Sequence, residues 1–139
     1  MNKLPVMFVV EDNGFAISVP VSVQTPDGSI SKALKGMPGL KIFECDGNCP
    51  IDSYDKVREA EVYIRSGKGP ALVHAHCTRP YSHSLSDDHS YYRTKEELEE
   101  EASRDVIKAF PKFLMETKTL SQAEIDAIKD DIDLSLIHI

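Results

Sequence analysis

The feature that most constrains the fold of this chain is a strand, helix and strand order between residues 40 and 76. Leu40–Cys45 (LKIFEC) and Pro70–His76 (PALVHAH) have the composition of β-strands. Between them, residues three and four apart predict one apolar stripe on a helix of about 15 residues. The positions at this spacing are Ile51, Tyr54, Val57, Glu61 and Ile64. Two strands and a helix within about 35 residues are typical of a right-handed crossover between parallel strands.

A further strand is predicted near the start of the chain. Val6–Val10 (VMFVV) has no polar interruption, which indicates a strand buried on both faces of a parallel sheet. Residues 14–31 are rich in Gly, Pro, Ser and Thr and predict a long loop, with a short helix near Ser31–Leu34. The predicted fold class is therefore α/β, with a parallel sheet flanked by helices.

The C-terminal third of the chain predicts helices. Thr94 and Ser121 are each followed three residues later by a glutamate, the pattern of a capping box. The helical pattern of residues 105–116 contains Pro111, which is expected to break or kink the helix. The residues expected to point inward from the last helix are Ile125, Ile128 and Ile132.

Charge and composition exclude several classes of protein. The net charge is −7, from 16 basic and 23 acidic residues, which disfavours binding to a phosphate backbone and therefore to nucleic acid. Apolar runs such as Pro5–Val10 are far shorter than the roughly 20 residues of a membrane helix. The N-terminal residues show no signal-peptide pattern, which predicts a cytoplasmic protein. Three cysteines, an odd number, predict reduced thiols at Cys45, Cys49 and Cys77.

Two polar segments follow predicted strands, where α/β sheets gather ligands. The first, Glu11–Ser18, begins with a carboxylate pair followed by Asn13 and Gly14. Such oxygen ligands suit Mg²⁺ beside a phosphate, because this ion takes few protein ligands. From spacing alone, an ordinary Asn-Gly turn remains the simpler interpretation.

The second segment, Thr78–Arg93, has no helical or strand period. It contains His83, which is placed among small hydroxyl residues and suits proton transfer near neutral pH. Arg79 and Arg93 bracket the segment, and each is expected to pair with Asp87 or Asp88 or to bind a phosphate.

Histidines two apart also resemble the ligands of a zinc hydrolase. A metal-dependent hydrolase would use His74, His76, His83 and Asp87. The six residues between His76 and His83 fit known zinc patterns poorly, and a buried, hydrogen-bonded role is the simpler expectation for His74. A non-catalytic interaction domain is the other alternative that composition leaves open.

Two strings together carry a resemblance to a known family. VVEDNGFAISVPV and RPYSHSLSDDHSYYR, about 70 residues apart, resemble the alpha part of the decarboxylating first component of 2-oxo acid dehydrogenase complexes. The similarity extends from about Leu4 to Asp131. It is strongest to the branched-chain 2-oxoisovalerate type and to bacterial alpha-beta fusions, which act in branched-chain amino acid catabolism.

The resemblance implies a role for particular residues. Asn13 would supply a side-chain oxygen, and Phe15 a main-chain carbonyl, to a Mg²⁺ ion that holds thiamine diphosphate. Ile17 and Ser18 would lie along the cofactor. His83 would contact the diphosphate and assist acyl transfer. The residues implied to order the loop are Arg79, Ser84, Ser86, Asp87, Tyr92 and Arg93.

The resemblance also implies partners and an activity. The whole enzyme would be an oligomer that decarboxylates a 2-oxo acid, the branched-chain acid being favoured over pyruvate, and passes the acyl group to a lipoyl domain of the acyltransferase component. The cofactor would lie between this domain and a pyrimidine-binding beta domain or subunit.

Three departures from the family pattern limit this expectation. Asp12 stands where the family usually has an asparagine, next to Asn13, the expected ligand. The upstream Gly-Asp-Gly segment, which gives another metal ligand, is not in this sequence. Residues 134–139 (LSLIHI) do not match the family's continuation. The expectation is a partial cofactor-binding domain over residues 1–133 with a tail of other origin, and little activity from this chain alone.

Overall fold

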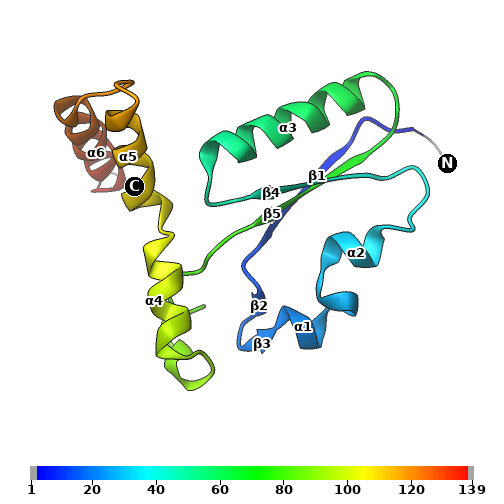
Figure 1. The fold of residues 1–139 in the computed structure, drawn as a ribbon, viewed down its shortest axis with the longest axis horizontal. Coiled ribbons are helices and arrows are strands. Elements are labelled where there is room, and N and C mark those ends of the chain that lie inside the picture. The colour runs from blue at the N-terminus through cyan, green and yellow to red at the C-terminus, as the bar shows by residue number, and fades with distance from the viewer. Residues whose placement is uncertain (1–2, 138–139) are drawn as a thin grey trace. The chain divides into compact units, whose positions relative to one another are not determined.

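The computed structural model describes residues 3–137, and its first compact unit is an α/β fold. Three parallel strands lie in the order β1–β5–β4, and α3 connects β4 to β5 (Figure 1). The strands are β1 (Met7–Asp12), β4 (Lys41–Asp46) and β5 (Ala71–His76), and α3 is Pro50–Arg65. Met7 and Lys41 both pair with Ala71, so the three strands are in step and end together. The predicted parallel crossover is confirmed.

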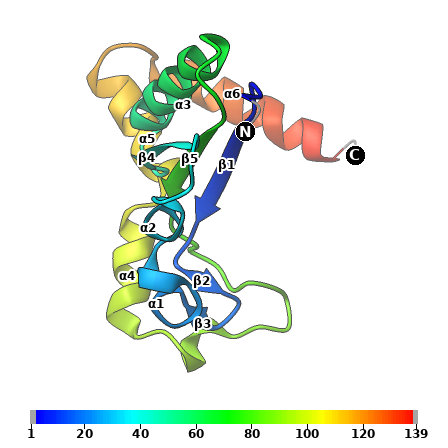
Figure 2. The ribbon, with the colours of Figure 1, turned by 90° about the vertical axis from the view of Figure 1, so that its right-hand side faces the viewer.

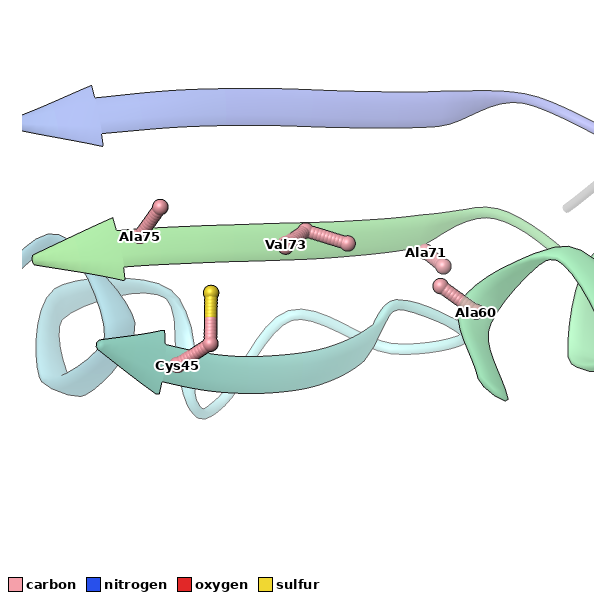
Figure 3. Close-up of a cluster of buried hydrophobic side chains, with 5 residues drawn as sticks. All are labelled: Cys45, Ala60, Ala71, Val73 and Ala75. Atoms are coloured by element: carbon pink, nitrogen blue, oxygen red, sulfur yellow. The ribbon is translucent and has the colours of Figure 1, made fainter. Parts of the chain in front are cut away.

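The core of this unit lies between α3 and one face of the sheet. It consists of the buried side chains drawn in Figure 3, where Ala60 faces Ala71 and the sulfur of Cys45 is directed at β5: Cys45, Ala60, Ala71, Val73 and Ala75. Of the predicted helical stripe, Ile64 packs against the core, whereas Ile51, Tyr54 and Val57 are exposed. Ala60 is instead the fully buried residue of α3. A small side chain such as that of Ala60 lets the helix pack closely on the sheet. A search for large apolar residues at helical spacing therefore overlooks it.

Strand β1 is an edge of the three-stranded sheet, which corrects the prediction of burial on both faces. Phe8 and Val9 are 53% and 55% exposed, whereas every residue of Ala71–Ala75 is buried. In the order β1–β5–β4, only β5 has a neighbour on each side. The central strand is therefore the PALVHAH segment.

The segment between β1 and β4 is more regular than the predicted loop. It contains the antiparallel pair β2 (Phe15–Ala16) and β3 (Val19–Pro20), the short helices α1 (Val21–Gln24) and α2 (Ile30–Leu34), and the 3₁₀ turn η1 (Pro26–Gly28). The short helix predicted near residues 31–34 is confirmed as α2. This segment follows directly from the end of β1 (Figure 2).

The polar segment after β5 contains the 3₁₀ turn η2 (His89–Tyr91) and leads to α4 (Lys95–Ser103). The predicted capping box is present: the Thr94 hydroxyl accepts a hydrogen bond from Glu97 N–H, and the Glu97 carboxylate accepts one from Thr94 N–H. The start of α4 is thus fixed by the sequence signal that predicted it.

Two helices form a second compact unit, α5 (Val106–Glu116) and α6 (Gln122–Ile137). Pro111 was expected to break or kink the helix; α5 continues past it to Glu116, so the helix is not broken there. In α6, Ile125 is buried as predicted, whereas Ile128 and Ile132 are exposed. The predicted tail includes residues 138–139, which lie outside the described residues.

The structure also bears on the predictions about membrane helices and cysteines. No helix within residues 3–137 has the length and apolar character of a membrane span. All three cysteines are free thiols, as expected.

Candidate functional site

A tight turn follows the end of β1. Asp12 Oδ1 accepts a hydrogen bond from Gly14 N–H at 2.8 Å, and Asn13 Oδ1 accepts one from Phe15 N–H at 3.1 Å. Gly14 has φ of 77°, which favours glycine, and a Cβ at this position would meet no atom within 4 Å. The turn therefore presents amide, carboxylate and carbonyl oxygens beside open space.

A buried histidine holds Asp12 in this turn. His74 is fully buried, and hydrogen bonds join its Nδ1 to Ser31 Oγ at 2.7 Å and its Nε2 to Asp12 Oδ2 at 2.9 Å. Burial raises the pKa of Asp12, but the hydrogen bonds from Gly14 and His74 outweigh it and hold the pKa below its ordinary value. The expected structural role of His74 is confirmed.

Phe15 joins the turn to the polar segment that follows β5. The guanidinium carbons of Arg79 and Arg93 lie 5.7 and 5.1 Å from the centre of its ring, and the ring of Tyr92 lies at 5.9 Å. Arg79 Nη2 also donates to Ile17 O at 2.9 Å and to the Tyr92 hydroxyl at 2.8 Å. Figure 2 shows the two segments side by side. The two motifs of the sequence therefore meet in space.

Ile17 adds a strained position to this contact. Its φ is 58°, a left-handed conformation that β-branched residues rarely adopt. The Arg79 guanidinium holds the Ile17 carbonyl in this conformation. Such positions cluster at binding sites because the surrounding structure must stabilise them.

Asp87 ties the polar segment together around His83. Its Oδ2 accepts hydrogen bonds from the Tyr92 hydroxyl at 2.6 Å and from His83 N–H at 2.9 Å. The hydrogen bond from Tyr92, and then that from His83 N–H, hold the pKa of Asp87 below its ordinary value. The side chain of His83 itself is exposed. The Asp87 carboxylate thus holds the loop through the backbone of His83, and the imidazole of His83 remains accessible.

Arg93 pairs with a residue that the sequence did not single out. It is buried and forms an ion pair with Glu101 of α4, which corrects the expected pairing with Asp87 or Asp88. Glu101 Oε2 also accepts a hydrogen bond from Arg79 N–H at 3.0 Å. The acidic run of α4 resembled a solvated face, and the only signal for Glu101 was its place at the end of that run.

The remaining predicted residues form fewer contacts. Ser84 Oγ and Ser86 Oγ lie 3.3 Å from each other, and Ser18 is exposed. The ligand set of the hydrolase alternative is not assembled: across the described part of the chain, the only group of three metal-ligand side chains joins His74 and His76 to Asp12, without His83 or Asp87.

Neutralising Asp87 is expected to loosen this loop. Asp87→Asn keeps the shape but weakens both hydrogen bonds to Oδ2, so limited proteolysis within residues 78–93 should accelerate several-fold. Because the pKa of Asp87 is lowered, its ionised form stabilises the loop above about pH 4, and wild-type protection should be lost as the pH falls below that value. Asp88→Asn is the matched control, since Asp88 bonds only locally, to Ser90. Equal cleavage of Asp87→Asn and wild type at pH 7 would contradict this role.

The turn and the start of the polar segment border a cavity of about 310 Å³. Its lining includes Asp12, Asn13, Gly14 and Phe15, with Thr78 from the segment after β5. The amide and carbonyl oxygens of Asn13 and Phe15 are the hard ligands that Mg²⁺ prefers. The donor set therefore fits a magnesium ion.

Buried guanidinium groups supply the complementary feature. Arg79 Nε, Arg79 Nη1 and Arg93 Nε are buried and have no hydrogen-bond partner among the described residues. Buried charged donors are costly unless an acceptor satisfies them. Both guanidinium groups lie against the ring of Phe15 and outside the lining of the cavity, so the unsatisfied donors for an anion stand beside the turn and not within the cavity.

Comparison with known proteins identifies one matching family and several relatives. The model of the family described as Dehydrogenase E1 component matches residues 1–138. The chain is 39% identical over 134 residues to the 2-oxoisovalerate dehydrogenase subunit alpha of Bacillus subtilis, covering 95% of this chain and 40% of that protein. It is 33% identical over 135 residues to the pyruvate dehydrogenase E1 component subunit alpha of Mycoplasma genitalium, covering 96% and 37%.

A third relative is similar over a shorter stretch. The 3-methyl-2-oxobutanoate dehydrogenase subunit alpha of Mycobacterium tuberculosis is 38% identical over 120 residues, covering 85% of this chain and 32% of that protein. The chain thus spans 40% or less of the length of these three relatives. All three relatives are alpha subunits. Since the family model matches nearly the whole sequence, this α/β chain belongs to the dehydrogenase E1 component family and is homologous to its alpha subunits.

Proposed function

We propose that this chain is part of the alpha component of a thiamine-diphosphate-dependent 2-oxo acid dehydrogenase, of the branched-chain type. The observation that carries the proposal is the contact between the two motifs. The turn with Asn13 and Phe15 is held against the loop of His83 by Arg79, which donates to Ile17 O. Residues of this chain therefore hold the two motifs together, which supports a cofactor site formed by both.

The turn would hold the metal and the diphosphate. Asn13 Oδ1 and the Phe15 carbonyl would be ligands of Mg²⁺, and Ile17 and Ser18 would lie along the cofactor. When bound, thiamine diphosphate supplies the carbanion chemistry of decarboxylation. The unsatisfied N–H groups of Arg79, which packs on Phe15 and donates to Ile17 O, support an anion beside this turn.

The loop would position His83. Its backbone N–H is held by Asp87, and Asp87 is held by Tyr92 and through it by Arg79. An exposed imidazole on an ordered backbone can give or take a proton where the substrate is presented. His83 would therefore act in transfer of the acyl group.

The partners follow from the same proposal. The relatives are named as alpha subunits, which supports a beta component as the partner that completes the cofactor site. A lipoyl domain would receive the acyl group in the assembled oligomer. The higher identity to the 2-oxoisovalerate enzyme than to the pyruvate enzyme supports a branched-chain 2-oxo acid as substrate.

The experiment is a comparison of substrates in the assembled enzyme that contains this chain, together with its beta component. Decarboxylation of 2-oxoisovalerate and of pyruvate is measured with and without thiamine diphosphate and Mg²⁺. The proposal predicts activity that requires both additions and a higher kcat/KM for 2-oxoisovalerate. A higher kcat/KM for pyruvate would overturn the substrate assignment, and activity without the cofactor would overturn the function.

A further inference from the structure

A second group of polar side chains lies on the face of the sheet opposite α3. His74 and His76 are two apart on β5, so both project from the same face. In the parallel register His76 lies opposite Asp12 of β1, and His74 lies opposite Glu44 of β4. Figure 3 shows the alternate positions of β5 on the other face, against the core. Three strands thus bring two imidazoles and two carboxylates together.

The donor atoms are close enough to share one ion. One ligand atom each from Asp12, His74 and His76 lies within 4.8 Å of the other two. His74 Nε2 and Asp12 Oδ2 are 2.9 Å apart. Because zinc binds nitrogen and oxygen ligands at about 2.0 to 2.2 Å, small side-chain movements would close these atoms around a single cation.

Each of the two inner ligands is oriented by a further contact. The Ser31 hydroxyl lies 2.7 Å from Nδ1 of His74, and it can accept from or donate to that nitrogen, so either imidazole tautomer is satisfied. Gly14 N–H donates to Asp12 Oδ1, which leaves Oδ2 directed at His74. Such contacts to the non-ligating atom are typical of metal-binding histidines and carboxylates.

An ion can reach this place from solvent. Asp12 and His76 both line the cavity of about 310 Å³, and the side chain of His76 is 50% exposed. Glu44 Oε2 lies 3.1 Å from His76 Nε2, and this carboxylate is exposed. Glu44 therefore contacts His76, but it is not part of the group of three ligand atoms.

We propose that Asp12, His74 and His76 form a binding site for a borderline divalent cation of the Zn²⁺ class, with Glu44 orienting the ring of His76. Two imidazoles with carboxylates favour zinc or cobalt, whereas Mg²⁺ prefers oxygen ligands alone. The site is thus distinct in chemistry from the magnesium ligands Asn13 and Phe15, and it does not depend on the proposed enzymatic function.

The test is calorimetric titration of the tag-free 139-residue chain with Zn²⁺, and separately with Co²⁺, in millimolar Mg²⁺. The wild type is expected to bind one ion. His76→Ala removes an exposed ligand, and Ser31→Ala removes the support of His74, so each should weaken binding by about 10 to 100-fold. His83→Ala is the matched control, because it removes an exposed histidine outside the group and should leave the affinity unchanged.

Two further controls exclude a competing thiol ligand and loss of the fold. Cys77→Ser tests whether a nearby thiol is the true ligand, and it should bind zinc as the wild type does. Thermal melting of each variant without metal shows whether the fold is retained. His76→Ala is chosen because the side chain of His76 is exposed, so its loss should leave the fold intact. No binding by the wild type, unchanged affinity in a folded His76→Ala, or loss of binding in Cys77→Ser would each overturn the site. Cofactor binding at Asn13 would be untouched by any of these results.

Discussion

Replacing His83 by alanine is expected to lower acyl transfer to a lipoyl acceptor by about 10² to 10⁴-fold in the assembled enzyme, the usual effect of losing a positioned acid or base. The imidazole is exposed, and only the backbone of His83 bonds to Asp87, so the loop should keep its structure. Affinity for thiamine diphosphate should fall much less than the rate. The measurement compares reductive acylation rates with cofactor titrations of the same samples.

The control for this variant is a change in the same loop that removes an exposed ring. Tyr81→Ala takes away a side chain that is 79% exposed, and it should leave acyl transfer near the wild-type rate. Full acyl transfer in His83→Ala would show that the imidazole has no part in the reaction.

Replacing Glu101 by alanine is expected to destabilise the first compact unit by about 2 to 4 kcal/mol. Its carboxylate is the ion-pair partner of Arg93, whose side chain is only 1% exposed, and removing one member of a buried pair leaves the other charge unpaired. The change also removes the acceptor of Arg79 N–H. The measurement is the free energy of unfolding of this chain in urea.

Glu100→Ala is the matched control, because its side chain is exposed on the same helix, and its effect should stay within about 0.5 kcal/mol. Equal stability of Glu101→Ala and Glu100→Ala would mean that the Arg93 pair contributes nothing to the fold.

The parallel unit could be predicted because its signals are local. The strand and helix patterns of residues 40–76 depend on composition and turn residues, and the capping box at Thr94 depends on two residues alone. The position of a strand within a sheet is not local. VMFVV reads as a central strand, yet PALVHAH takes the centre, because pairing is decided by the whole sheet.

Contacts across the candidate site were harder to predict than the contact between its motifs. The roles of Asn13, Phe15 and His83 are proposed from the resemblance of those motifs. The ion pair of Arg93 with Glu101 joins the loop to the next helix, and nothing in the sequence separates Glu101 from its acidic neighbours. Ion pairs between residues of different elements depend on the fold. The sequence therefore gives the charged residues but not which of them pair.

The buried chain of Ser31, His74 and Asp12 shows the same limit. The alternation of β5 placed His74 and His76 on one face, which the structure confirms. The two hydrogen-bond partners of His74, Ser31 and Asp12, come from 43 and 62 residues away along the chain. No spacing rule connects positions so far apart before the order of the strands is known.

The proposed role of this turn is tested by thiamine diphosphate binding to the assembled enzyme, with and without Mg²⁺, in the wild type and in Asn13→Ala. We expect wild-type binding to require Mg²⁺ and Asn13→Ala to weaken it by at least about tenfold, because a hard oxygen ligand is lost. Ser22→Ala, on the exposed surface of α1, is the matched control and should bind as the wild type does. Cofactor affinity that is independent of Mg²⁺, or unchanged in Asn13→Ala, would contradict the assignment of this turn as the cofactor site.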